Sequence, residues 1–203
     1  MADVLSVLKT LFRVSLLQIA VGLIMGIVTL VFYFLGYYIS VGGGLLLDPG
    51  EIPVTLAGAI GGPVAGIIAG ICQGGVYAPA RNLPSHILGG IFVGAWYYLA
   101  WIVSTGRPWP RFTRIAIWIV GIPLYYLLIV APVYTFIYSA SIHMSFLPTY
   151  ISFAQKIIPE IGLTLAASGV ILALLPERFA RPLILPDVKP KTELLSESEK
   201  PSA

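Results

Sequence analysis

Long apolar runs separated by short polar segments dominate the chain. The apolar runs cover approximately residues 14–40, 52–78, 84–104, 115–138 and 149–175. A helix needs about 20 apolar residues to cross the hydrocarbon core of a bilayer, and each run reaches that length. The pattern therefore predicts an all-α integral membrane protein.

The ends of the chain have a different pattern from its middle. Residues 1–13 mix apolar and basic positions in the manner of an amphipathic helix that lies at a membrane surface. Residues 177–203 are rich in charged residues, proline and serine, a composition typical of disorder. We expect an interfacial lead-in over residues 1–13, a transmembrane bundle over residues 14–176 and a disordered cytoplasmic tail over residues 177–203.

The composition favours a lipid environment and offers little chemistry for catalysis. Hydrophobic residues make up 58% of the chain and charged residues 10%, whereas a soluble domain has about 25% charged residues. The single cysteine, Cys72, excludes an intramolecular disulfide, and the two histidines have no metal-ligand spacing. Neither a phosphate-binding loop nor a nucleophile elbow is present. We expect no enzymatic activity, no cofactor, no metal site and no nucleic-acid partner.

Residues 52–78 contain a periodic stripe of glycines. Gly58, Gly62, Gly66 and Gly70 recur at every fourth position, so a helix would place them on one face. A face without side chains allows a second helix to approach closely, which predicts helix packing there. The Gly61-Gly62-Pro63 sequence in the middle of the run predicts a break in the helix.

The distribution of lysine and arginine bears on the number of spans. Basic residues cluster near the N-terminus, over residues 107–114 and over residues 178–191. The positive-inside rule puts all three clusters in the cytoplasm, which requires an even number of crossings between them. A helical hairpin over residues 52–78 meets that requirement. It predicts a six-helix bundle in the plasma membrane, with the hairpin as spans 2 and 3 and both termini cytoplasmic. One straight helix over residues 52–78 would give five spans and remains the alternative.

With six spans, several polar residues fall in the outer half of the membrane. The expected substrate-binding residues are Glu51, Arg81, Asn82, His86, Tyr150, Gln155, Lys156 and Glu160. Ionisable groups inside a membrane helix are costly and usually functional. Other roles stay open. Glu51 can cap a helix N-terminus, Arg81 can contact lipid headgroups, His86 can be an interfacial residue, and Lys156 can pair with Glu160 one helical turn away.

The stretch LLLDPGEIPVTLAGAIGGPVAGIIAG resembles the substrate-binding S components of energy-coupling factor (ECF) vitamin transporters. Members of that family have an acidic residue, Ile-Pro, a small-residue helix, Gly-Pro and a second small-residue helix. The matching residues here are Glu51, Ile52-Pro53 and Gly62-Pro63. The motif is degenerate and covers only this stretch. A weaker similarity connects the same motif with the membrane sensor domains of LytS-type histidine kinases.

The ECF resemblance implies a membrane-embedded subunit that binds a small organic micronutrient and docks on a transmembrane coupling protein carrying two ATPase subunits. Family members often carry an alanine-x-x-x-alanine contact in the first helix for docking. This chain has Gly22 and Gly26 at that spacing, with Ala20 nearby, so these three residues are the expected docking residues. An accessory subunit of a larger membrane complex and a membrane sensor module remain the alternatives.

Overall fold

The computed structural model describes residues 4–36, 39–40, 46–76 and 79–185. The described part is almost entirely helical. Its helices are α1 (Val4–Leu11), α2 (Leu16–Phe34), α3 (Glu51–Gly61), α4 (Pro63–Val76), α5 (Pro79–Ser104), α6 (Pro110–Leu124), α7 (Ala131–Ser141), α8 (Phe146–Leu174) and α9 (Glu177–Ala180). A π-helical segment, η1 (Tyr125–Val130), joins α6 to α7, and the two-residue strands β1 (Ile39–Ser40) and β2 (Leu46–Leu47) pair antiparallel.

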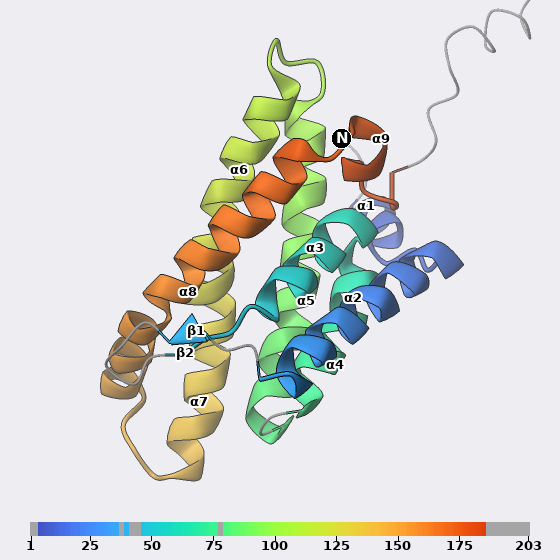
Figure 1. The fold of residues 1–203 in the computed structure, drawn as a ribbon. Coiled ribbons are helices and arrows are strands. Elements are labelled where there is room, and N and C mark those ends of the chain that lie inside the picture. The colour runs from blue at the N-terminus through green and yellow to red at the C-terminus, as the bar shows by residue number, and fades with distance from the viewer. Residues whose placement is uncertain (1–3, 37–38, 41–45, 77–78, 186–203) are drawn as a thin grey trace, which may run out of the picture.

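Four helical segments in the described part are long and apolar enough to cross a membrane. They are α2, α5, the continuous α6–η1–α7 segment and α8. The expected all-helical fold is confirmed, and the four segments are consistent with a membrane location. Figure 1 shows α5 between two groups of helices, with α2, α3 and α4 on one side and α6, α7 and α8 on the other.

The run of residues 52–78 is divided into α3 and α4 at Gly62. Gly62 has φ +80°, a conformation that favours glycine, and Pro63 is the first residue of α4. Two buried side chains of α2 hold the two ends of α3. Gln18 Nε2 donates to the Gly61 carbonyl at 3.0 Å, and Thr29 Oγ1 donates to the Gly50 carbonyl at 3.0 Å. Helix α3 therefore runs antiparallel to α2.

The glycines of α3 and α4 lie where helices approach closely. A Cβ on Gly66 would overlap the Gly90 carbonyl of α5, and a Cβ on Gly70 would lie 2.5 Å from the His86 carbonyl oxygen. A Cβ on Gly58 would also contact α5, at 3.0 Å from Val93 Cγ1. At these three positions the lack of a side chain lets α5 approach closely. Gly62 differs, because it forms the break between the helices and contacts Ile184.

Gly22 and Gly26, which the sequence offered as partner-docking residues, both face α4 of the same chain. A Cβ on Gly22 would lie 2.8 Å from Ile68 Cβ, and one on Gly26 would lie 2.6 Å from Cys72 Sγ. Small residues permit close approach, but their spacing does not say which helix approaches. Ala20 is partly buried on the same helix.

The tail boundary predicted at residue 177 is also wrong for residues 177–185. Helix α9 packs on the bundle, and the Leu183 amide donates to the Ile60 carbonyl at 2.8 Å. The segment packs there because burying the apolar side chains of Ala180 and Ile184 against the bundle is favourable. The rest of the predicted tail, residues 186–203, lies outside the described residues. In the predicted lead-in, residues 4–11 form α1.

Candidate functional site

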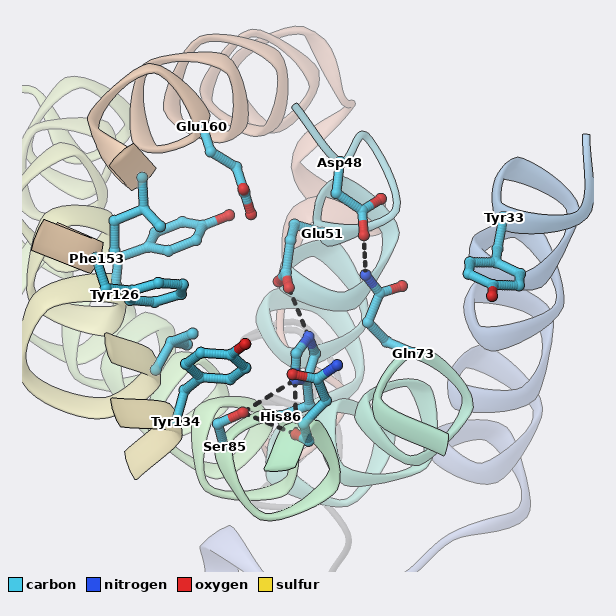
Figure 2. A pocket seen from close by; sticks show the side chains of 13 residues that line it. Tyr33, Asp48, Glu51, Gln73, Ser85, His86, Tyr126, Tyr134, Phe153 and Glu160 are labelled. Atoms are coloured by element: carbon cyan, nitrogen blue, oxygen red, sulfur yellow. Dashed lines mark hydrogen bonds and ion pairs between the residues drawn. The ribbon is translucent and has the colours of Figure 1, made fainter. Parts of the chain in front are cut away.

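A cavity of about 590 Å³ opens at the end of the bundle where α3 and α5 begin, and the middle of α8 contributes to its lining. We call it the polar cavity; Figure 2 shows its side chains. Its polar lining residues are Asp48, Glu51, Gln73, Asn82, Ser85, His86 and Glu160. Its aromatic and aliphatic lining residues are Tyr33, Tyr126, Val130, Tyr134, Phe153 and Ile157.

Four of the eight expected substrate-binding residues line this cavity: Glu51, Asn82, His86 and Glu160. A fifth, Arg81, lies next to the lining without belonging to it. Its guanidinium carbon is 5.9 Å from the ring centroid of Tyr134 and 5.1 Å from that of Tyr138, which is cation–π distance.

The other three expected residues, Tyr150, Gln155 and Lys156, do not line the cavity. The Tyr150 hydroxyl donates to the Leu127 carbonyl at 2.9 Å, and Gln155 and Lys156 are exposed. The reason is the rotation of α8 about its own axis, which turns Phe153, Ile157 and Glu160 towards the cavity. Among the described residues, no ion pair joins Lys156 to Glu160.

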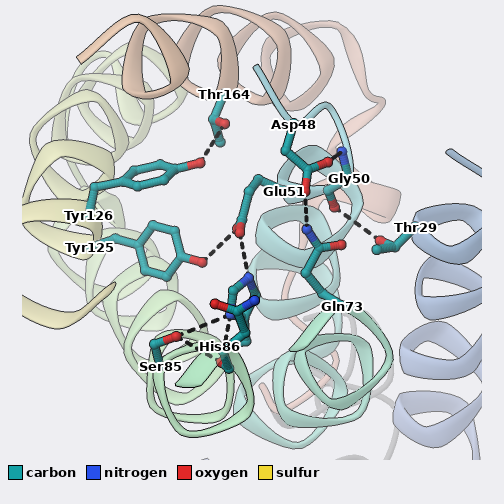
Figure 3. Close-up of polar contacts among 11 residues, drawn as sticks. Thr29, Asp48, Gly50, Glu51, Gln73, Ser85, His86, Tyr125, Tyr126 and Thr164 are labelled. Carbon is teal, nitrogen blue, oxygen red and sulfur yellow. Dashed lines mark hydrogen bonds and ion pairs between the residues drawn. The ribbon is translucent and has the colours of Figure 1, made fainter. Parts of the chain in front are cut away.

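Glu51, the first residue of α3, is the centre of a buried hydrogen-bond network (Figure 3). Its Oε1 lies 2.7 Å from His86 Nε2, and its Oε2 accepts a hydrogen bond of 2.7 Å from the Tyr125 hydroxyl. Glu51 is 3% exposed and His86 is 7% exposed. The position also favours a carboxylate because the N-terminus of a helix carries partial positive charge. Glu51 therefore both lines the cavity and begins a helix.

The proton positions in this network follow from its geometry. His86 Nδ1 lies 2.8 Å from the Asn82 carbonyl oxygen, which can only accept, so Nδ1 carries a hydrogen. The 2.7 Å contact between Nε2 and Glu51 requires one more proton between the two groups. Whichever side holds that proton, the histidine and the carboxylate together have no net charge.

Asp48 holds the turn that precedes α3. Its Oδ1 accepts the Gly50 amide at 2.8 Å, and its Oδ2 accepts the Gln73 side-chain amide of α4 at 2.6 Å. Burial raises the pKa of Asp48, and the nearby Glu51 carboxylate adds to that rise, while the hydrogen bonds from Gly50 and Gln73 oppose it. Because Thr29 also binds the Gly50 carbonyl, this turn is attached to α2 and α4 at once.

The π-helical segment η1 supplies two consecutive tyrosines to the interior. Tyr125 binds Glu51, and the Tyr126 hydroxyl lies 2.8 Å from Thr164 Oγ1 of α8. Both tyrosines are at most 1% exposed. Single π-helical turns inside α-helices are rare and occur frequently at functional sites. In the sequence, only Pro123 and Pro132 on either side of this segment indicated an irregular helix.

No protein-family model, curated protein or solved structure matches this chain. The similarity to ECF S components therefore stays a resemblance based on one sequence motif. The function has to be argued from the polar cavity and from the charge and shape of its walls.

Sequence reasoning missed several lining residues. Asp48 and Ser85 adjoin expected residues, so their polarity was a usable signal. Gln73, Tyr33 and Phe153 carried no signal, because amide and aromatic side chains occur throughout such helices. Tyr134 and Phe153 form a stacked pair whose ring centroids are 4.6 Å apart, and this pair forms one aromatic wall of the cavity.

Proposed function

We propose that this chain is a membrane-embedded, non-enzymatic subunit that binds a small, vitamin-like organic molecule for uptake. The observation that carries the proposal is the polar cavity. Ligand sites are concave, of about 300–1,000 Å³, and combine apolar and aromatic walls with a few convergent polar groups. A cavity of about 590 Å³ with stacked rings, one buried carboxylate and two half-buried ones has these properties.

The fixed geometry of the cavity supports binding as its role. Glu51 is held by His86 and Tyr125, and the turn at Asp48 is held by Thr29 and Gln73. Groups that are already positioned lose little conformational entropy when a ligand arrives. An accessory subunit that served only for packing would fill this space with side chains, since voids weaken a bundle.

In the proposed topology α3 and α4 each cross part of the bilayer, which makes six spans with both termini in the cytoplasm. Two contacts support it. Gln18, near the start of α2, binds Gly61 at the α3–α4 turn, and Arg114 binds Glu177 at 2.8 Å where the basic loop meets the C-terminal segment. Basic residues thus gather at one end of the bundle and the polar cavity opens at the other, as the positive-inside rule requires for an outward-facing site.

We further propose that the subunit works with a transmembrane coupling protein and two ATPase subunits. Because Gly22 and Gly26 are buried against α4, the docking surface for these partners lies elsewhere on the chain. The outward face of α2 is exposed and apolar, for example at Leu16, Leu23 and Ile27.

The test is native mass spectrometry of the protein released gently from its membrane. We expect a bound small molecule in the wild type. The variant Ile157→Trp, which fills the cavity, should lose it, whereas Ile158→Trp, on an exposed position of the same helix, should keep it. Co-purifying ATPases would support the uptake role. A ligand-free chain in a stable complex with unrelated membrane subunits would refute the proposal in favour of an accessory role, and a signalling partner would favour a sensor.

A further inference from the structure

Acidic residues are concentrated at the polar cavity. The described part of the chain contains four acidic residues, Asp48, Glu51, Glu160 and Glu177, and the first three line this one cavity. The fourth pairs with Arg114 at the other end of α5. Carboxylates are expensive to bury in a membrane protein and are normally paired when they are buried. Three of them around one cavity call for positive charge.

The chain itself supplies only part of that charge. His86 is the only basic side chain among the described lining residues, and its pairing with Glu51 leaves that pair neutral. Asp48 is held by two neutral donors, and Glu160 makes no ion pair with any described residue. Figure 2 shows the Glu160 carboxylate pointing into the cavity from α8. Arg81 lies at the edge over Tyr134 and offsets one charge, so the cavity keeps a negative excess when the Asp48 and Glu160 carboxylates are both ionised.

The aromatic side chains indicate what kind of cation fits. Tyr33, Tyr126, Tyr134 and Phe153 line the cavity, and cations are attracted to the faces of such rings. Among the described residues, no three histidine, cysteine or acidic side chains form a group that could hold a metal ion. The carboxylates are spread around a cavity of about 590 Å³, an arrangement that suits a molecule larger than a bare ion.

We propose that the ligand of the polar cavity is an organic cation with a flat ring, whose positive group lies near Glu160 and Asp48 and whose ring lies against the Tyr134–Phe153 pair. This inference rests on the proposed binding function and names its substrate class. A carboxylate-bearing molecule would meet like charge in this cavity, and a neutral molecule would leave Glu160 without a cationic partner.

The test uses three flat probes of nearly the same size but different charge: benzamidinium, benzamide and benzoate. Binding of each to the full-length protein in lipid nanodiscs is measured by saturation-transfer NMR. We expect benzamidinium to bind best, with a preference over benzamide of about 10-fold or more, since a hydrogen bond to a charged group contributes about 1.5–3 kcal/mol, or about 10- to 150-fold. Benzoate should bind worst.

Variants test which carboxylate produces the preference for benzamidinium. Glu160→Gln and Asp48→Asn should each reduce the ratio of benzamidinium affinity to benzamide affinity by about 10-fold or more, with both affinities measured in the same variant. Glu177→Gln makes the same chemical change at the other end of α5 and should leave the preference intact. Melting temperatures of all variants identify any that fail to fold, and two independent cavity variants keep the test decisive if one does.

The two proposals fail in different ways. Equal or better binding of benzamide or benzoate, or a neutral or anionic molecule released from the native protein, would overturn the cation inference and leave the binding function standing. A preference for benzamidinium that survives both cavity variants would also overturn it. Absence of binding by any probe, together with a ligand-free native protein, would overturn both.

Discussion

Replacement of Gly22 by alanine tests whether the small-residue face of α2 packs within the chain or serves a partner. The new Cβ would lie 2.8 Å from Ile68 Cβ, 2.9 Å from the Ala65 carbonyl oxygen and 3.0 Å from Ala65 Cα. The optimum separation of two carbon atoms is about 3.5–4.0 Å. Two of these three neighbours are backbone atoms that cannot rotate away, so α2 and α4 have to separate by several tenths of an ångström or more.

The magnitude follows from two opposing effects. Overpacking of a close contact costs about 1–3 kcal/mol. Replacing glycine by alanine inside a helix stabilises the helix by up to about 1 kcal/mol, because alanine has the higher helix propensity. Gly162→Ala is the matched control, because Gly162 is exposed in the middle of α8 and nothing lies within 4 Å of its would-be Cβ. The difference between the two variants therefore isolates the packing cost of about 1–3 kcal/mol.

The assay is thermal unfolding of the purified protein in mild detergent, followed by tryptophan fluorescence. A chain of this size loses about 2–4 °C in Tm per kcal/mol, so Gly22→Ala should melt about 2–12 °C below Gly162→Ala. Gly22→Leu should be less stable still. Equal Tm values for the two alanine variants, with loss of partner binding only in Gly22→Ala, would refute the internal packing and restore the docking interpretation.

Three further predictions concern the site. Thr29→Val should lower stability by about 1 kcal/mol and weaken ligand binding, because it removes the hydrogen bond to the Gly50 carbonyl; Thr29→Ser should retain both properties. Glu51→Leu should lower the free energy of unfolding in detergent by about 3–5 kcal/mol, because His86 loses its buried partner. Adding His86→Leu should recover part of this loss, and a double variant without recovery would argue against coupling between the two residues. Burial gives Asp48 a higher pKa in the folded protein than in the unfolded chain, so its contribution to stability is full below pH 3.8 and falls as the pH rises through the folded pKa. Tm is measured at several pH values between 3 and 7 for the wild type and for Asp48→Asn, and the variant should lack the decline due to Asp48. The same dependence of Tm on pH in both proteins would exclude Asp48 as the source of the decline.

The candidate site was only partly predictable. Glu51, His86 and Glu160 stood out because ionisable residues within apolar runs are rare enough to be noticed one at a time. Lys156 stood out for the same reason, but it is exposed and does not line the cavity. Lys156 and Glu160 are separated by only about 40° around α8, so the exact rotation of that helix decides that Glu160 lines the cavity while Lys156 stays exposed beside it.

The sequence by itself determined the helical, lipid-compatible character of the chain and the break at Gly62. These properties follow from the length of apolar runs, the depletion of charge and the local backbone preferences of glycine and proline, all of which act over a few consecutive residues. The tertiary structure alone decided that Gly22 and Gly26 face α4, that residues 177–185 pack on the bundle, and that three carboxylates share one cavity with a stacked pair of rings. Those outcomes depend on how helices distant in sequence rotate and pack against each other, and no local pattern specifies that rotation.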